Sequence, residues 1–265
     1  MTQSTMRRLR DGWRIQWRVI HALMIRELTT RFGRENIGFL WIMVEPLLFA
    51  GLVSLVWRIM IGPEEHGLEI AAFVISGYLP LTLFRHCVGR SAAVFQANGS
   101  LVYHRQVKIL DFMVVRLLIE LLGGMMAYLF IAIVLVPFDQ FPLPENMGLL
   151  ILGWMLYFLV TASICLIIAP LSEMSEVLEK FLPVTTYIMI PFSGTFTMAS
   201  FLTPSIREAL MWSPFVHCME MMREGIWGDE VRTYYDTLFP IVFAMILLPF
   251  GLVLCRRVRR TMTVD

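Results

Sequence analysis

Long apolar stretches alternate with short charged segments along the chain. Six of these stretches are long enough to cross the ~30 Å hydrocarbon core of a bilayer as helices. They cover residues 37–61, 70–89, 112–137, 147–169, 181–202 and 238–255. A backbone in lipid must satisfy its own hydrogen bonds as helices or a closed barrel, and unbroken apolar runs do not fit the alternating strands of a barrel. The pattern therefore predicts an all-α integral membrane protein with one six-span domain over residues 37–255.

Two polar segments flank this domain, a cytoplasmic N-terminus over residues 1–36 and a basic tail over residues 256–265. Within residues 13–32 of the first, apolar side chains recur at steps of three and four at Trp13, Trp17, Ile20, Met24 and Leu28, and Val19 and Leu23 widen this stripe. This helical period predicts a basic amphipathic helix that lies in the membrane interface. Such a helix serves either as an anchor to anionic lipid or as a docking site for a cytoplasmic partner.

Composition supports a membrane protein, because 57% of the residues are hydrophobic and 16% are charged. A soluble enzyme, a secreted disulfide scaffold and a disordered chain are all excluded by these fractions. The formal net charge of +1 is uninformative as a sum, yet 17 of the 22 basic residues fall in segments that six spans place on one side. Basic residues concentrate on the cytoplasmic side of membrane proteins. Both termini are therefore expected in the cytoplasm.

Two of the segments between spans are longer than a plain connection needs. Residues 91–108 predict a short helix, a break near Asn98 and a return into the third span. Residues 203–236 predict two short amphipathic helices at the outer surface, the first beginning near Pro204 and broken at Pro214, and the second following with Val216, Met219, Met222 and Ile226. The second of them should end at Gly228, and the pair is suited to a re-entrant lid.

Several charged side chains fall within the predicted spans, where they are costly and usually face a bundle interior or a watery cavity. Arg116 and Glu120 are four residues apart, so we expect them to pair along one helix face. Arg58 and Arg85 either extend to the membrane surface or contact an anionic substrate. The plentiful aromatic side chains form an interfacial belt or stack against sugar rings.

The sequence lacks the short motifs that are typical of nucleotide-binding, metal-binding and catalytic sites. No GxxxxGK[ST] loop for ATP phosphates occurs, and neither do HExxH, GxSxG or CxxC. We expect no catalytic, cofactor or metal site in this chain, and no nucleic-acid partner. The sequence is that of a passive pathway whose energy comes from elsewhere.

A family resemblance appears in ordered motifs over roughly residues 20–260. The segment LMIRELTTRF at residues 23–32, with Gly38, Trp41 and Pro46, resembles the start of ABC-2-type transporter permeases. Gly77–Tyr78–Leu79–Pro80 with Phe84 resembles the family's second span. Further matches to its capsule and O-antigen polysaccharide branch, especially the capsule members, are Ser193–Phe196, Leu202–Pro204, Arg207, Trp212–Pro214, His217, Glu220, Arg223–Gly225 and Trp227.

The resemblance implies the membrane subunit of an ABC exporter in a bacterial inner membrane. Two copies would pair about a two-fold axis, and two separate ATPase subunits, which bind the ATP and magnesium, would dock underneath. The cargo would be a lipid-linked, often acidic polysaccharide that moves from cytoplasm to periplasm. An O-antigen, drug or lipid exporter and a membrane-embedded glycosyl or acyl transferase remain as alternatives. The resemblance leaves open whether periplasmic or outer-membrane export proteins attach.

Three groups of residues are then the candidate sites. ATPase coupling is expected at Arg26, Glu27, Arg31, Arg34, Glu35, Asn98 and Arg105. The substrate pathway is expected to include Trp41, Arg58, Tyr78, Phe84, Arg85 and Phe196. A periplasmic gate is expected at Pro204, Arg207, Trp212, Pro214, His217, Glu220 and Arg223.

Overall fold

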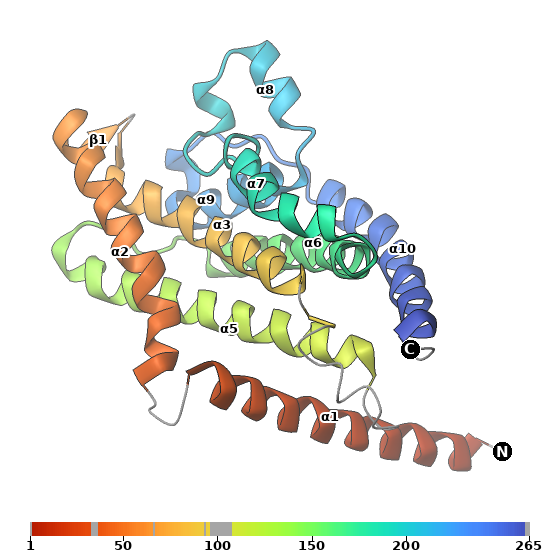
Figure 1. Cartoon of the computed structure of the whole chain (residues 1–265). Coiled ribbons are helices and arrows are strands. Elements are labelled where there is room, and N and C mark those ends of the chain that lie inside the picture. The colour runs from red at the N-terminus through yellow and green to blue at the C-terminus, as the bar shows by residue number, and fades with distance from the viewer. Residues whose placement is uncertain (1, 33–36, 66, 93, 96–107, 263–265) are drawn as a thin grey trace.

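The structure, a computed structural model, describes residues 2–32, 37–65, 67–92, 94–95 and 108–262 and is a helical bundle (Figure 1). Its helices are α1 (Thr2–Phe32), α2 (Ile37–Met60), α3 (Ile70–Ala92), α5 (Ile109–Leu135), α6 (Met147–Met174), α7 (Glu176–Phe192), α8 (Pro204–Leu210), α9 (Pro214–Trp227) and α10 (Leu238–Met262). Short 3₁₀ turns cover Val136–Phe138, Ala199–Phe201 and Gly228–Glu230. The all-α prediction is confirmed.

Within the described residues, four helices are long and apolar enough to cross a membrane: α3, α5, α6 and α10. They differ in how deeply they are buried. In α3, 83% of the span is buried inside the bundle, whereas in α10 only 22% is. A helix that is apolar all round and exposed on most sides is suited to lipid rather than water. α3 is thus an inner helix, and α10 faces outward.

The fifth span is the one whose predicted bounds are wrong. The prediction placed a helix over residues 181–202, but α7 begins at Glu176 and ends at Phe192. The chain then runs through turns and a 3₁₀ segment until α8 begins at Pro204. The other five helices agree with their predicted spans to within a few residues, except that α6 and α10 continue further at their C-terminal ends.

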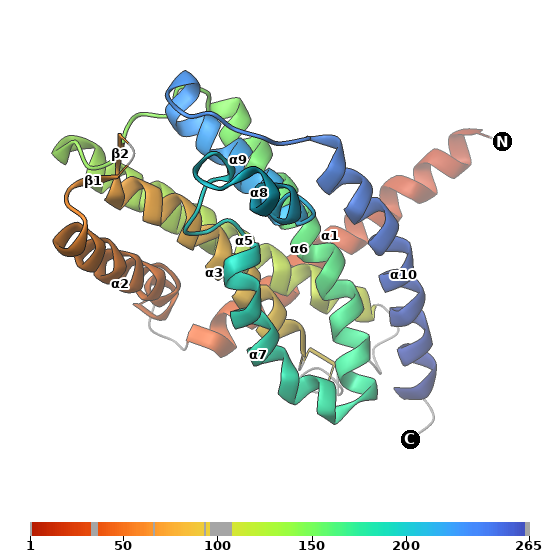
Figure 2. The ribbon, with the colours of Figure 1, turned by 90° about the horizontal axis from the view of Figure 1, so that it is seen from above.

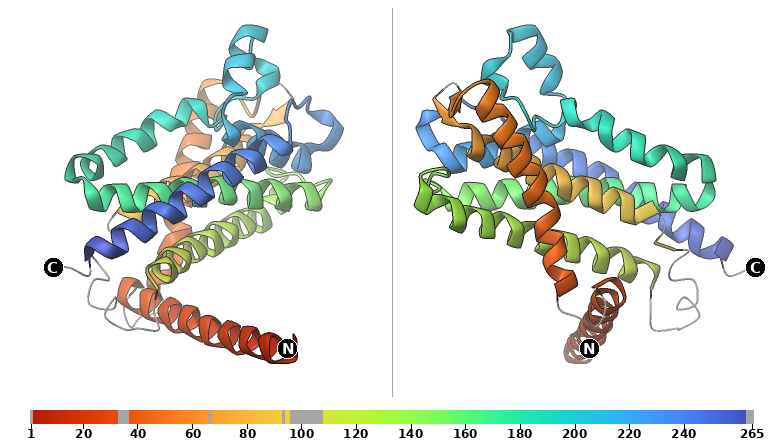
Figure 3. Two further views of the ribbon diagram at one scale, coloured as in Figure 1. Left: turned by 90° about the vertical axis from the view of Figure 1, so that its right-hand side faces the viewer. Right: turned by 60° about the vertical axis from the view of Figure 1, so that its left-hand side comes forward.

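The centre of the bundle is α6, which contacts α3, α9 and α10. Glycines permit the closest of these approaches. A Cβ atom at Gly153 of α6 would lie 2.6 Å from the Met222 Cγ atom of α9, and one at Gly225 of α9 would lie 2.6 Å from the Leu150 nitrogen. α9 is consequently buried along nearly its whole length. This corrects the prediction of a second surface helix, because only α8 projects from the bundle (Figure 3).

The amphipathic N-terminal helix is confirmed and is longer than its apolar stripe indicated. α1 crosses the bundle on the side opposite α8 and packs against α5 (Figures 1 and 3). Leu23 is buried, while Val19, Ile20, Met24 and Leu28 are partly buried against the core. Trp13 and Trp17 of the same stripe are exposed to 72% and 63%. Exposed tryptophans on a basic helix are typical of a membrane interface.

A two-stranded hairpin joins α2 to α3 and was not predicted. β1 (Glu64–Glu65) pairs antiparallel with β2 (Leu68–Glu69), and Gly67, at a φ of 82°, allows the tight turn. The hairpin lies at one end of the bundle and both termini lie toward the other (Figures 1 and 2).

Candidate functional site

A groove runs between α2, α3 and α7, which lie beside one another in Figure 2. It has a volume of about 780 Å³. Its lining residues are Glu45, Leu48, Phe49, Leu52, Val53, Trp57, Tyr78, Leu81, Arg85, Tyr187, Ile190 and Phe196. Two aromatic pairs bridge it: the rings of Phe49 and Tyr78 stack 4.5 Å apart, and those of Trp57 and Phe196 are 5.6 Å apart. The groove is therefore an aromatic and aliphatic surface with few charges.

A smaller polar cavity of about 240 Å³ adjoins this groove. It shares Glu45, Tyr78, Arg85 and Tyr187 with the groove and adds Pro46, Thr82, His86, Gly89, Pro183 and Thr186. The Arg85 guanidinium lies 4.6 Å from the centre of the Tyr187 ring, a cation–π distance. Of the predicted pathway residues, Tyr78, Arg85 and Phe196 are thus brought together.

The other pathway candidates lie elsewhere. Phe84 is buried and packs edge-on against Phe215 at 5.0 Å. Arg58 donates from Nη1 to the Gln140 Oε1 atom at 2.8 Å, which ties the end of α2 to the loop after α5, outside the lining of both cavities. Trp41 belongs to α2, but its side chain lies outside the described residues.

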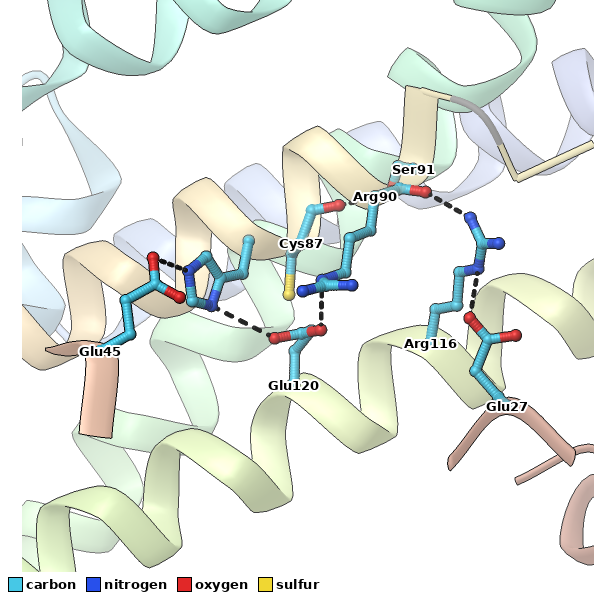
Figure 4. Close-up of polar contacts among 8 residues, drawn as sticks. Glu27, Glu45, Cys87, Arg90, Ser91, Arg116 and Glu120 are labelled. Atoms are coloured by element: carbon cyan, nitrogen blue, oxygen red, sulfur yellow. Dashed lines mark hydrogen bonds and ion pairs between the residues drawn. The ribbon is translucent and has the colours of Figure 1, made fainter. Parts of the chain in front are cut away.

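An ion-pair network centred on the buried Glu120 includes Glu45 and His86 from the lining of the polar cavity (Figure 4). The carboxylate of Glu120 on α5, which is 2% exposed, forms an ion pair with Arg90, whose Nε atom lies 2.7 Å away, and it lies 3.4 Å from His86 Nδ1. The opposite nitrogen of the same ring, Nε2, lies 3.7 Å from Glu45 of α2. Removing a buried carboxylate from water is costly, and these pairs offset that cost. The network joins α2, α3 and α5 at one level of the bundle.

The expected pairing of Arg116 with Glu120 is wrong. Arg116 donates from Nε to Glu27 of α1 at 3.1 Å and from Nη1 to the Arg90 carbonyl at 2.7 Å. Glu120 is held instead by the α3 side chains. Arg116 and Glu120 both lie on α5, and each finds its partner on a neighbouring helix. An isolated helix could not supply these partners in the interior. The sequence signal for this was His86 and Arg90, one turn apart on α3.

A second buried charge fastens the segment between α7 and α8. Arg223 of α9 is fully buried and donates to the carbonyls of Gly194, Thr195 and Thr197 at 2.7–2.8 Å. Its guanidinium also lies 4.2 Å from the Phe73 ring centre. Burial lowers the pKa of Arg223 to about 10, so the side chain stays charged at neutral pH. These three carbonyls belong to the segment after α7, where Gly194 takes a φ of 72° and the helix does not continue.

Glu220, one turn before Arg223, holds two further segments. Its carboxylate accepts from the Ala199 and Tyr234 backbone nitrogens at 3.1 and 3.2 Å. Burial raises the pKa of Glu220, and the neighbouring Arg223 opposes that rise. Two of the charged residues assigned to a gate, Glu220 and Arg223, therefore brace α9 against the connections on either side of it.

The remaining gate candidates form the surface around α8. Pro204 begins α8 as predicted, and Pro214, which was expected to break the pattern, is the first residue of α9. The Arg207 guanidinium lies 4.2 Å from the Tyr234 ring centre, and Trp212 is 80% exposed. His217 faces the Met211 carbonyl from Nε2 at 2.8 Å, while Nδ1 accepts from the Asp236 backbone nitrogen at 2.8 Å. Burial lowers the pKa of His217, in accord with a neutral ring that accepts at Nδ1.

The coupling candidates are only partly described. Arg26 is exposed on α1, and Glu27 forms the ion pair with Arg116. Arg31 belongs to α1, but its side chain lies outside the described residues. Arg34, Glu35, Asn98 and Arg105 also lie outside them. Among the residues that are described, no group of three His, Cys, Asp or Glu side chains is placed to hold a metal ion.

Comparison with known proteins assigns the chain to a family. Residues 18–227, which include the groove, the ion-pair network and α9, match the ABC-2 type transporter family. The chain belongs to that family. Capsule polysaccharide export inner-membrane protein CtrC of Neisseria meningitidis serogroup B is 36% identical over 238 residues, 90% of each chain.

More distant relatives carry similar names. Capsule polysaccharide export inner-membrane protein BexB of Haemophilus influenzae is 34% identical over 242 residues, 91% of each chain. The polysialic acid transport protein KpsM of Escherichia coli is 24% identical over 247 residues, 93% of this chain and 96% of its own length. The predicted family is confirmed. It is a family of transporters rather than enzymes, which decides against a membrane-embedded transferase.

Proposed function

We propose that this chain is the membrane-spanning permease of an ABC exporter that moves a lipid-linked capsular polysaccharide from the cytoplasm to the periplasm. The observation that carries the proposal is the match, over about nine tenths of the chain, to inner-membrane proteins of capsule polysaccharide export. The groove supports it, because aromatic rings offer faces on which the C–H faces of sugars stack. The oxyanion of an acidic cargo has a basic partner there in Arg85.

The assembly follows from the same proposal. α2 and α7 complete six spans with α3, α5, α6 and α10, and both termini face the cytoplasm. One six-span chain encloses too narrow a bundle for a sugar polymer, so two copies pair about a two-fold axis and the groove faces the shared pathway. ATP is bound and hydrolysed by two separate subunits that dock on the cytoplasmic side, near the C-terminal end of α1.

Deletion of this chain tests the function directly. We expect polysaccharide to be synthesised but retained inside the cell, so that surface polymer is lost while total polymer persists. Restoring the wild-type chain should return polymer to the surface. Unchanged surface polymer in the deletion strain would refute the proposal.

The ATPase partner is tested by co-purification. The wild-type chain should recover a subunit with a P-loop, and Arg31→Glu should lose that partner and surface export together while still inserting in the membrane. Lys180→Glu, a matched charge reversal at an exposed site on α7, should retain both. Wild-type export and partner recovery by Arg31→Glu would contradict docking at this part of α1.

A further inference from the structure

The connections on either side of α9 bring two arginines to one aromatic ring. Between α7 and α10 the sequence has three basic residues, and one of them, Arg223, is fully buried. The other two are Arg207 of α8 and Arg232 of the segment before α10. Their guanidinium groups lie 4.2 Å and 5.3 Å from the centre of the Tyr234 ring, within the cation–π range of about 6 Å. Both surface arginines of this region thus gather at Tyr234.

The segment that carries Tyr234 is fastened to α9. The Tyr234 backbone nitrogen donates to the Glu220 carboxylate at 3.2 Å. Thr233 and Tyr235 both donate from their hydroxyl groups to Glu224, one turn further along the helix. Three contacts in three consecutive residues therefore hold the backbone around the Tyr234 ring in one position.

The contacts of this segment alternate with a period of two residues. Thr233 and Tyr235 face α9, whereas Arg232 and Tyr234 contact each other. Such a period is that of an extended chain, whose successive side chains point to opposite sides. The Tyr234 ring and the Arg232 guanidinium therefore point away from α9. Both are at the surface, since Arg232 is exposed and Tyr234 is partly exposed.

The connection that carries Arg207 is held by the same helix and by the same side chains. Glu220 accepts from the Ala199 nitrogen before α8 at 3.1 Å, in addition to its bond with the segment of Tyr234. His217 contacts the Met211 carbonyl after α8 at 2.8 Å and accepts from the Asp236 nitrogen at 2.8 Å. Each of these two side chains of α9 thus joins both connections, which fixes Arg207 relative to Tyr234.

The two guanidinium groups lack an anion. Within the part of the chain that the structure describes, neither Arg207 nor Arg232 has a side-chain ion pair or hydrogen bond. Two positive charges held at one ring repel each other, and an anion beside them would offset this repulsion. A guanidinium that lies over a ring keeps its in-plane N–H groups free, and these bind carboxylate oxygens in a bidentate manner.

We propose that Arg207, Arg232 and Tyr234 form a subsite for the carboxylate of an acidic sugar unit. The inference rests on the proposed function, because it takes a polysaccharide as the cargo and the end of the bundle with α8, opposite α1, as the periplasmic end (Figure 1). The guanidinium edges bind the carboxylate, the ring holds both guanidinium groups in place, and the phenol hydroxyl pairs with a sugar hydroxyl. The subsite holds acidic units of the polymer as they leave the bundle.

Binding of short oligosaccharides to the purified full-length chain in micelles, measured by calorimetry, tests this inference. The acidic probe is a tetrasaccharide of alternating glucuronate and N-acetylglucosamine, and chitotetraose is a neutral probe of the same length. A diglutamate peptide with both ends capped presents two carboxylates without a sugar, and inorganic phosphate tests a free anion. We expect the acidic tetrasaccharide to bind at least fivefold more tightly than each of the other three. Equal or tighter binding of any one of those three would overturn the proposal.

Substitutions at the surface of the subsite should separate its parts. Arg207→Gln and Arg232→Gln should each weaken binding of the acidic tetrasaccharide about fivefold and leave the affinity for chitotetraose unchanged. Tyr234→Phe keeps the ring and should stay within about twofold of the wild type, whereas Tyr234→Leu should bind as weakly as an arginine variant. Lys180→Gln, an exposed positive charge on α7, should bind as the wild type does.

Two results would refute this assignment. Wild-type affinity of both arginine variants would place the bound sugar elsewhere on the chain. Equal losses in Tyr234→Phe and Tyr234→Leu would show that the ring does not hold the guanidinium groups in place.

The outcome is separable from that of the proposed function. These affinities are measured without ATPase subunits and without transport. Intact polysaccharide export together with no preference for the acidic tetrasaccharide would reject the subsite alone. A preference for it in a chain whose deletion leaves surface polymer unchanged would reject the exporter and keep the subsite.

Discussion

The lack of a side chain at one glycine of α3 allows this helix to approach the segment between α7 and α8 closely. Gly77 of α3 lies against the Thr195 carbonyl, and a Cβ atom there would lie 2.1 Å from that oxygen and 3.0 Å from Arg223 Nη2. Thr195 is one of the three carbonyls that Arg223 binds. The close approach therefore holds the segment that carries Phe196 into the groove, and a side chain at Gly77 would push that segment away.

The first prediction concerns Gly77→Ala. The methyl group must displace backbone, which is fixed by a buried guanidinium, so we expect the free energy of unfolding to fall by about 2–3 kcal/mol, as for other overpacked interiors. Thermal unfolding in micelles measures this change. Gly89→Ala on the same helix is the matched control, because a Cβ atom there meets nothing within 4 Å. It should be neutral or stabilising by up to about 1 kcal/mol. Equal effects of the two substitutions would contradict the steric argument.

At the scale of helices, the apolar runs predicted where most spans begin and end, because lipid-crossing length and amphipathic period are local properties. Interactions distant in sequence were not predictable in this way. Arg223 binds carbonyls of the segment that follows α7, and one of them, Thr195, lies 28 residues before it in the chain. α9 is buried because glycines on two helices allow contact with α6.

In the candidate site, too, the sequence predicted some features, whereas others depend on contacts between residues that are distant in sequence. Arg85, Tyr78 and Phe196 were expected along the pathway and do line the groove. The Arg116–Glu120 pair was expected from spacing alone, and the structure replaces it with contacts to α1 and α3. A four-residue spacing gives the opportunity for a pair, but buried charges pair with whatever partner the whole bundle brings within reach.

The second prediction concerns the ion pair between α1 and α5. Glu27 and Arg116 are 23% and 16% exposed and 3.1 Å apart, so water screens them only partly. A double-mutant cycle of Glu27→Gln and Arg116→Gln should show a coupling energy of roughly 1–2 kcal/mol in the free energy of unfolding, as for a charge-assisted hydrogen bond. The control cycle combines Arg116→Gln with Glu230→Gln, because Glu230 lies on an exposed turn far along the chain. The effects of these two substitutions on the free energy of unfolding should be additive. Additive effects of the Glu27 cycle would show that this ion pair does not help to hold α1 against α5.

At the scale of the whole molecule, the surface and the ends of the chain give one consistent picture. Large apolar side chains are exposed along α2, α5, α7 and α10, which suits lipid and partner subunits rather than water. The hairpin between α2 and α3 and the two termini lie toward opposite ends of the bundle (Figures 1 and 2). The start of the basic helix α1 and the C-terminal end of α10 lie toward the end with the termini, and the proposed function places this end in the cytoplasm, in accord with the positive-inside rule.

The third prediction tests that orientation by thiol labelling. Cys87, Cys165, Cys218 and Cys255 are all buried, so the wild-type chain should react little with a membrane-impermeant maleimide. Cysteine at Trp212, an 80% exposed position after α8, should be labelled in sealed spheroplasts. Cysteine at Arg10, exposed on α1, should be labelled only after the membrane is opened. The reverse order of labelling would invert the topology. It would also place the basic α1 and its ion pair on the periplasmic side, where a cytoplasmic ATPase cannot dock.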